Sequence, residues 1–481
     1  MKMKGFAGWQ MLIKKELLLA YRNKTVLISA VMIWLLFIAA MVCTFLNYQA
    51  NHKQRLEANA LFRQQWEHQQ RNPHDAGHFG TYLFKSVNLL NVFDTGINDY
   101  TGSTYRVEAH VQHEISNSEA ENNDAAMRFG NLTLALILQL LIPLFLLFNT
   151  STSITSEKES GTLKMLLAQG LSSRKMIWAK VLANYILIVA IVLPVFILMA
   201  IAALYSPDSA SLLPRLLWIL ITFLLYFLLI ALLGTFISAM SSHSGKALLS
   251  ALCFWIFMSI IFPKVITGLA DRKYPLMSRA SFSDLVEQGY RKGLNGKDPY
   301  AARGERYINS LLKKYHVDSV ASLPFNIEGL TLQFNEDYRT MAFNHYFKEV
   351  ENSFDQQQRF ISLSGIFDPF VSTKWLSMAL AGSDFYHHEH FFKRAQAYRN
   401  HLIRQLNMQL AMHSKDVKGE YKVGAAYFSQ LKDFKYQLPT LYQVLQVKKV
   451  AFLSLIGWIF MLTLLIQFIA SRSLALNYAS A

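Results

Sequence analysis

The chain has 481 residues, of which 52% are hydrophobic and only 16% are charged. Soluble proteins carry about 25% charged residues, so this composition disfavours a large soluble enzyme and favours a protein that crosses a membrane several times. The modest mean hydropathy of +0.21 predicts sizeable water-facing parts beside the membrane spans. The net charge of +15 is explained by basic residues that orient spans and touch anionic lipid, so nucleic acid is not an expected partner.

The two cysteines, Cys43 and Cys253, both stand inside apolar runs. This placement excludes a disulfide framework and a cysteine-rich metal site. The first apolar run begins after Lys24 and is too long for the hydrophobic core of a signal peptide. We therefore interpret it as a retained first span.

Six apolar runs are long enough to cross a hydrocarbon core, which takes about 20 helical residues. Residues 47–130 and 267–447 are predicted to lie outside the membrane and to form a mainly helical (α or α+β) exterior domain. The predicted fold class is an all-α polytopic membrane protein. The predicted spans are residues 25–46, 131–149, 177–204, 214–239, 247–266 and 448–470.

Charge sets the expected orientation of these spans. Residues 1–24 and the loop at residues 150–176 are rich in Lys and Arg, and the tail at residues 471–481 carries Arg472. The connector after the third span has no basic residue before Arg215. By the positive-inside rule the basic segments are cytoplasmic, so both termini are expected in the cytoplasm.

Two stretches of the second exterior segment carry apolar side chains at the three-to-four-residue spacing of an amphipathic helix. Asp384 is the predicted N-cap of one of them. Ordinary helix packing and a substrate groove both remain possible roles for these stripes. The first stripe contains Phe391, Ala395, Tyr398, Leu402, Leu406 and Leu410, and the second contains Met341, Phe347, Val350 and Phe354.

The loop after the second span contains SEKESGTLKMLLAQGLSSRKMIWAK, from Ser156 to Lys180. Its pattern predicts a short amphipathic helix, a turn and a return helix at the membrane surface, with charges such as Glu157 and Glu159 facing the cytoplasm. One interpretation is an interfacial hairpin with snorkelling charges. The other is a docking element that passes the motion of a soluble partner to two spans.

The pattern E-x-x-x-G-T-L-x-x-L-L, followed by a break and a basic residue, resembles the coupling-helix segment of type-2 ABC exporter permeases. That family often has a proline in the break, where this chain has Gln169, Gly170 and Leu171. The resemblance implies contact with a separate ATPase. The implied ATPase-coupling residues are Glu157, Glu159, Gly161, Thr162, Leu163, Leu166, Leu167 and Arg174.

Two further segments show related resemblances. Residues 9–24 resemble the amphipathic connecting helix of the same family through Lys15, Glu16 and Arg22. Residues 362–399 resemble an uncharacterised domain of paired bacterial permeases, a group placed with copper-enzyme-maturation permeases. These resemblances imply a bacterial cytoplasmic (inner) membrane and a second permease subunit, alike or different. They supply no substrate. The matching positions of the third segment are Pro369, residues 376–382, Asp384, Phe392, Tyr398 and Arg399.

The sequence has no G-x-x-x-x-G-K-[ST] phosphate loop, so ATP and Mg²⁺ are expected on the partner ATPase and not on this chain. No catalytic residue and no cofactor of its own are expected. His387 and His390 would share one face of a helix and are weak candidates for a metal site, the alternative being a solvated helix start.

The function indicated by these features is the transmembrane permease subunit of an ABC exporter. One alternative is ATPase-driven mechanotransmission to an envelope protein or lipoprotein without a pore. Another is a membrane scaffold or sensor.

Overall fold

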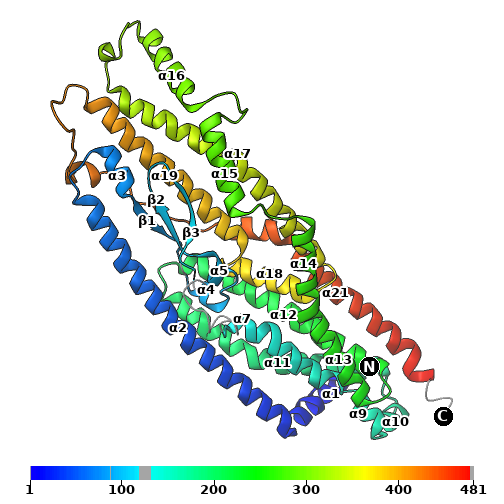
Figure 1. The fold of residues 1–481 in the computed structure, drawn as a ribbon. Helices are drawn as coiled ribbons and strands as arrows, with labels where there is room; N and C mark the ends of the chain where they lie inside the picture. Colours follow the sequence, from blue (N-terminus) through cyan, green and yellow to red (C-terminus); the bar gives the residue numbers. More distant parts are fainter. Residues whose placement is uncertain (1, 87, 119–131, 477–481) are drawn as a thin grey trace.

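The computed structural model of the protein describes residues 2–86, 88–118 and 132–476. The molecule is elongated, with long helices side by side at one end and a second group of helices around a small sheet at the other (Figure 1). Four predicted segments extend beyond the described residues: 1–24, 47–130, 131–149 and 471–481.

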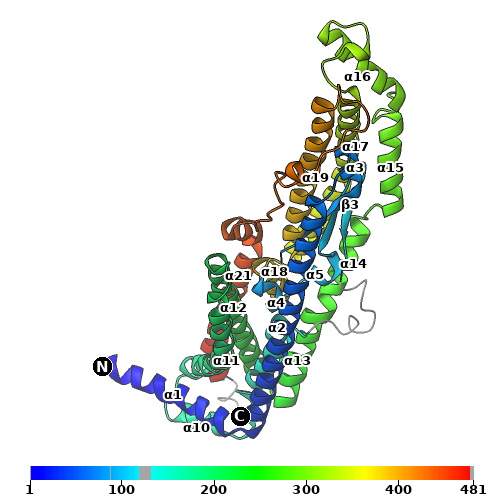
Figure 2. The ribbon, with the colours of Figure 1, turned by 90° about the vertical axis from the view of Figure 1, so that its left-hand side faces the viewer.

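The two ends of the molecule carry different elements. The basal end carries α1 (Lys2–Arg22), α9 (Thr155–Glu159) and α10 (Thr162–Ala168). Figure 2 shows α1 running across the foot of the long helices, with α10 beside it. The distal domain, formed by residues 68–118 and 274–440, lies at the opposite end.

Six described helices are long and apolar enough to cross a membrane, which confirms the predicted polytopic fold class. They alternate in direction along the chain, so α1, which precedes the first, and the last turns of α21 both lie at the basal end (Figure 1). Their elements are α2 (Lys24–Glu67); α7 (Leu134–Leu136), η2 (Ile137–Leu141) and α8 (Ile142–Ser151), which lead into α9; α11 (Ser173–Leu204); α12 (Ser209–Met240); α13 (Ser244–Ile256), η3 (Phe257–Ile261) and α14 (Phe262–Lys273); and α21 (Leu441–Leu476).

Helix α12 lies at the centre of this bundle, against α8, α11 and α21. Its inward side chains Phe223 and Phe227 are fully buried. The helix formed by α13, η3 and α14 is instead largely exposed. Only 6% of its most apolar 18-residue stretch is buried, and Leu249 is 62% exposed. An apolar face of this kind needs lipid or another protein against it.

The distal domain contains a three-stranded antiparallel sheet in the order β1-β2-β3. The distal domain therefore combines helices with a small sheet, which agrees with the α+β form of the two that the sequence predicts for this part of the chain. The strands are β1 (Thr81–Phe84), β2 (Thr104–Val107) and β3 (Gln112–Ser116). The helices of the distal domain are α3 (Pro73–Phe79), α4 (Leu89–Phe93), α5 (Asn98–Thr101), α15 (Arg279–Lys292), α16 (Tyr300–Tyr315), η4 (Val320–Ser322), α17 (Ile327–Ser364), α18 (Pro369–Ala381), α19 (Phe385–His413) and α20 (Ala425–Phe428).

The stripe predicted from Phe391 onward is confirmed in α19, where Phe391, Leu402 and Leu406 are buried. Its predicted cap is also confirmed, because the Asp384 side chain accepts a hydrogen bond from the backbone N–H of His387.

The stripe predicted in α17 is wrong at Met341, which is 47% exposed, whereas Phe343 is buried. A helix turns by about 100° per residue, so Met341 stands about 120° away from Phe347. Phe343 is four residues before Phe347 and shares its face. The inward stripe therefore starts at Phe343.

A buried charge cluster joins the spans to the distal domain. Asp384 contacts Lys448 Nζ of α21 at 2.9 Å and His387 Nδ1 at 2.6 Å. Arg215 of α12 lies 3.4 Å from the other ring nitrogen of His387. Although burial opposes ionisation, Lys448 and His387 hold the pKa of Asp384 well below its usual range. The cluster fixes the start of α19 against α12 and α21.

Candidate functional site

The α9–α10 hairpin at the basal end follows from its local sequence. Gly161 adopts φ 74°, a left-handed conformation that glycine accepts without strain, and this residue forms the N-cap of α10. The next turn ends at Ser172, whose side chain accepts a hydrogen bond from the Lys175 N–H and caps α11. The chain therefore turns sharply twice between the second and third spans.

A compact ion network anchors α9. Glu157 Oε1 lies 2.9 Å from Lys15 Nζ of α1 and 2.9 Å from Lys180 Nζ of α11. Glu16 Oε1 completes the group, at 3.2 Å from Lys15 Nζ and 3.1 Å from Lys180 Nζ. Two carboxylates thus meet two ammonium groups where α1, α9 and α11 come together.

The network is largely withdrawn from solvent, because the Lys180 side chain is only 2% exposed and that of Glu157 is 11% exposed. The expectation that Glu157 presents its charge to water is therefore wrong. The reason is that α1 covers this side of α9 and brings its own charges. Partial burial disfavours the charged form of Lys15, but Glu157 and Glu16 raise its pKa above the ordinary value.

Two further contacts join α9 to the fourth and fifth membrane helices. Lys158 Nζ donates to the carbonyls of Ala239 and Ser241, both at 2.8 Å, at the end of α12. Glu159 accepts from the backbone N–H of Ser244 at 2.8 Å and from its hydroxyl at 2.6 Å, at the start of α13. A cation at a helix C-terminus and an anion at a helix N-terminus are both favourable placements.

Helix α10 makes far fewer contacts. Leu163 is fully buried, and Leu167 packs partly against the span core. Leu166 is half-buried, whereas Met165 is 61% exposed. The Thr162 hydroxyl lies 3.4 Å from the carbonyl of Glu157 and so ties the start of α10 back to α9.

The fold brings some of the predicted charged residues together and leaves others apart. Lys15, Glu16 and Glu157, predicted in separate segments, meet in one network. Arg22 and Arg174 are exposed and stand apart from it. Lys180 is a central member that the sequence shows only as one more basic residue of the loop.

The two histidines considered for a metal have different partners. His387 Nδ1 contacts Asp384 at 2.6 Å, whereas His390 Nδ1 lies 3.2 Å from the Tyr436 hydroxyl. Within the described part of the chain, the cluster suited to a metal ion lies elsewhere in the distal domain. It consists of His74, His78 and His110.

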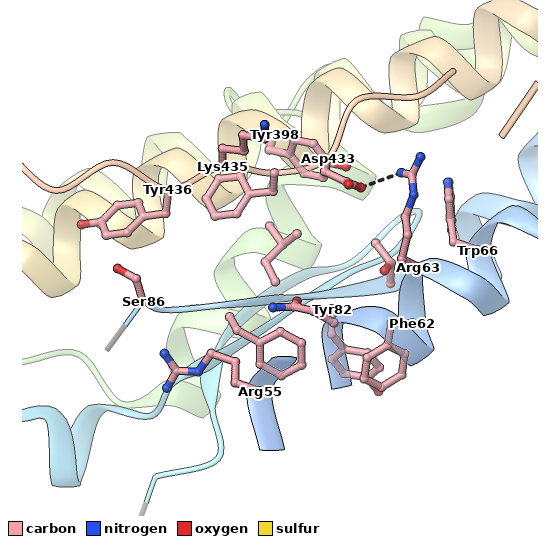
Figure 3. A pocket seen from close by; sticks show the side chains of 15 residues that line it. Arg55, Phe62, Arg63, Trp66, Tyr82, Ser86, Tyr398, Asp433, Lys435 and Tyr436 are labelled. Carbon is pink, nitrogen blue, oxygen red and sulfur yellow. Dashed lines mark hydrogen bonds and ion pairs between the residues drawn. The ribbon is translucent and has the colours of Figure 1, made fainter. Parts of the chain in front are cut away.

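A cavity of about 380 Å³ opens in the distal domain between α2, β1 and the segment around residue 434. Figure 3 shows Arg55, Phe62 and Tyr82 on one side of it, and Arg63 reaching from that side to pair with Asp433 on the other. Basic and aromatic side chains together suit an anionic ligand with an apolar part.

The aromatic stripe of α17 also lines a cavity. Phe343 and Phe347 pack against Phe392 in the core and border a space of about 300 Å³ together with Phe354 and Phe385. The stripe thus serves packing and also leaves a groove, so both possibilities raised by its sequence remain.

Six apolar helices, the second and third of which are connected by the anchored α9–α10 hairpin at the basal end, define this chain as a multi-pass membrane protein. Residues 79–271, which contain the hairpin and end in α14, match the model of the ABC-2 family transporter protein. This match supports a type-2 ABC permease and, by that family's nature, an ABC ATPase as partner. Residues 281–437 match a domain of unknown function, DUF3526. Among curated proteins, none matches the chain.

Proposed function

We propose that this chain is the permease subunit of an ABC transporter in a bacterial cytoplasmic membrane, and that a separate ATPase docks on α10 from the cytoplasm. The observation that carries this proposal is the contrast within the hairpin. Helix α10 leaves Met165 61% exposed at the foot of the molecule, while α9 directly behind it is bonded to α1, α11, α12 and α13.

The mechanism that follows is mechanical. ATP and Mg²⁺ act on the partner, whose closure displaces α10. Separating Glu157 from Lys180 would remove one of the two carboxylate partners of a buried ammonium group, and breaking a buried ion pair costs up to about 3–5 kcal/mol. The network therefore moves as one unit and carries α1, α11 and the ends of α12 and α13 with α9. The free energy enters through the ATPase, so this chain needs no catalytic group.

The proposed orientation rests on charge. Basic residues gather in residues 1–24 and 150–176, which the fold places at the basal end. The positive-inside rule then puts this end and both termini in the cytoplasm, and α1 against anionic lipid. A second permease subunit, alike or different, would cover the apolar face of α13 and α14. Export is the direction that the resemblance implies.

Mechanotransmission to an envelope protein is a second candidate, favoured by the continuity of α2. This helix has 44 residues, about 66 Å at 1.5 Å per residue, and a bilayer core is about 30 Å thick. Its far part packs on β1 of the distal domain. A shift at the basal end can therefore reach the distal domain through one rigid element.

The test is co-purification with the ATPase encoded beside this chain, in detergent or nanodiscs, followed by its ATP hydrolysis rate. The informative variant is Met165→Asp, which places a charge on the exposed face of α10. Met341→Asp is the matched control, since Met341 is an exposed helical methionine in the distal domain. We expect Met165→Asp to lose the ATPase and Met341→Asp to retain it. Equal retention by both variants would refute docking on α10.

A further inference from the structure

Three histidines of the distal domain turn the same ring atom toward a common point. His74 and His78 lie four residues apart on α3, and His110 lies in the turn between β2 and β3. His74 Nε2 is 3.2 Å from His78 Nε2 and 3.3 Å from His110 Nε2. The ligand atoms of all three lie within 4.8 Å of one another.

The partners of His110 fix its tautomer. His110 Nδ1 lies 2.6 Å from Glu336 Oε1, and the same oxygen accepts from the His110 backbone N–H. Glu336 is buried and also accepts from Arg399. Its carboxylate is therefore the acceptor for the backbone N–H and for ring Nδ1 of His110. The proton of a neutral His110 ring therefore sits on Nδ1, and Nε2 presents a lone pair.

His74 is oriented in the same sense by a chain of amides. Gln333 donates through Nε2 to the carboxylate of Asp337, so its Oε1 accepts from Asn407 Nδ2. Asn407 Oδ1 therefore faces His74 Nδ1, at 3.0 Å, and can only accept. His74 Nδ1 carries the proton, and the Nε2 atoms of His74 and His110 direct lone pairs at each other across 3.3 Å.

Two opposed lone pairs make no hydrogen bond and call for a cation between them. In a tetrahedral zinc site with Zn–N bonds of about 2.0–2.1 Å, neighbouring ligand nitrogens lie about 3.3–3.4 Å apart. The two measured Nε2 separations, 3.2 and 3.3 Å, come close to this value. The carboxylate behind His110 and the amide behind His74 are the outer partners that hold metal-bound imidazoles in place.

The backbone adds an independent sign of a constrained site. His110 adopts φ 62°, in the left-handed region that residues other than glycine seldom occupy. Its bonds to Glu336 hold it there, and such strained positions gather at functional sites.

We propose that His74, His78 and His110 bind one Zn²⁺ ion through their Nε2 atoms, with a water molecule or a ligand group in the fourth position. His78 is exposed, which leaves the ion open to solvent on one side. The ion joins the first exterior segment to α17 and α19, which hold Glu336 and Asn407. In the distal domain the ion has either a structural role, holding these segments together, or the role of a Lewis acid that contacts a bound ligand.

The test uses the full chain, purified without a histidine tag and stripped of metal with a chelator. Zn²⁺ is titrated by calorimetry, and Co²⁺ is added separately to record the visible absorption of a tetrahedral complex. The variant is His78→Ala, which removes an exposed ligand and should leave the fold intact. The control is His345→Ala, an exposed histidine of α17 outside the cluster.

We expect one Zn²⁺ per chain for the wild type and for His345→Ala. Binding by His78→Ala should be at least about tenfold weaker, because loss of even an outer partner of a metal ligand typically costs about 10–100-fold and His78 is a ligand itself. Zn²⁺ should also raise the melting temperature of the wild type more than that of His78→Ala. Binding of equal strength in both variants, or no stoichiometric binding by the wild type, would overturn the site. Neither result depends on the ATPase.

Discussion

Helices α9 and α10 are neighbours in the chain, yet the fold holds them in different ways. Helix α9 has Glu157 and Thr155 buried and is bonded to α1, α11, α12 and α13. Helix α10, which begins after Gly161, buries only Leu163 and exposes Met165. The difference teaches that two adjacent helices can be held very differently, and it is the basis of our proposal that α10 receives force from an ATPase and α9 transmits it.

The strongest challenge to this contrast is Glu157→Ala. The substitution leaves Lys180, 2% exposed, without one of its two carboxylate partners. Removing one partner of a buried ion pair costs about 3–5 kcal/mol, and the partly exposed Lys15 reduces the loss toward the lower value. We expect a clear fall in the melting temperature of the detergent-solubilised chain.

The double variant Glu157→Gln with Lys180→Met serves as its control, because it removes the charge pair from both sides. This variant should recover most of the lost stability. If Glu157→Ala and the double variant melt together with the wild type, the network does not hold α9.

Gly161→Val tests the joint between the two helices. At φ 74° a β-branched residue is strained by about 1–2 kcal/mol, and no atom lies within 4 Å of the added Cβ, so the cost comes from the backbone alone. We expect Gly161→Val to lower the ATPase stimulation by the permease, measured on the co-purified complex. Gly161→Asn should act more weakly, because Asn tolerates this conformation, and equal activity of Val and Gly would contradict a rigid joint.

Glu159→Gln sharpens the comparison within α9. Glu159 is far more exposed than Glu157, at 42% against 11% of its side chain, and it accepts two hydrogen bonds from Ser244. The amide oxygen of Gln can still accept one of them, so the melting temperature should fall much less than for Glu157→Ala. A loss as large as that of Glu157→Ala would mean that the contact with the start of α13, and not the buried network, anchors the hairpin.

The smallest expected effect on stability belongs to Met165→Asp. A substitution on an exposed helix face changes the unfolding free energy by less than about 0.5 kcal/mol. Thermal unfolding of the chain alone should therefore match the wild type, even though the ATPase is lost. A large drop in melting temperature would show that α10 is part of the packed bundle.

The fold was predictable where one physical force dominates locally. Lipid demands about 20 apolar residues per span, so runs such as residues 177–204 indicate spans from the sequence alone. The stripe beginning at Phe391 and the cap at Asp384 follow from helix geometry. The stripe that included Met341 failed because the spacing from Met341 to Phe347 crosses to another face.

The site was predictable only in its parts. Residues Lys15, Glu16 and Glu157 were each marked by a resemblance, but Lys15 and Glu157 are 142 positions apart and nothing in the sequence pairs them. In the sequence, Lys180 looks like any basic residue near a membrane. Its role becomes visible only in the fold, where it contacts Glu16 of α1 and Glu157 of α9. The His74 and His78 pair shows the four-residue spacing of a helical ligand pair, whereas His110 joins it only through the β2–β3 turn.

The most direct test of the division between the two helices is site-specific photocrosslinking in the complex with the ATPase. A benzophenone amino acid replaces Met165 on α10 in one protein and Met341 on α17 in the other. The account predicts a crosslink to the ATPase from position 165 and none from position 341. A crosslink from position 341, or none from position 165 in a complex that still hydrolyses ATP, would contradict it.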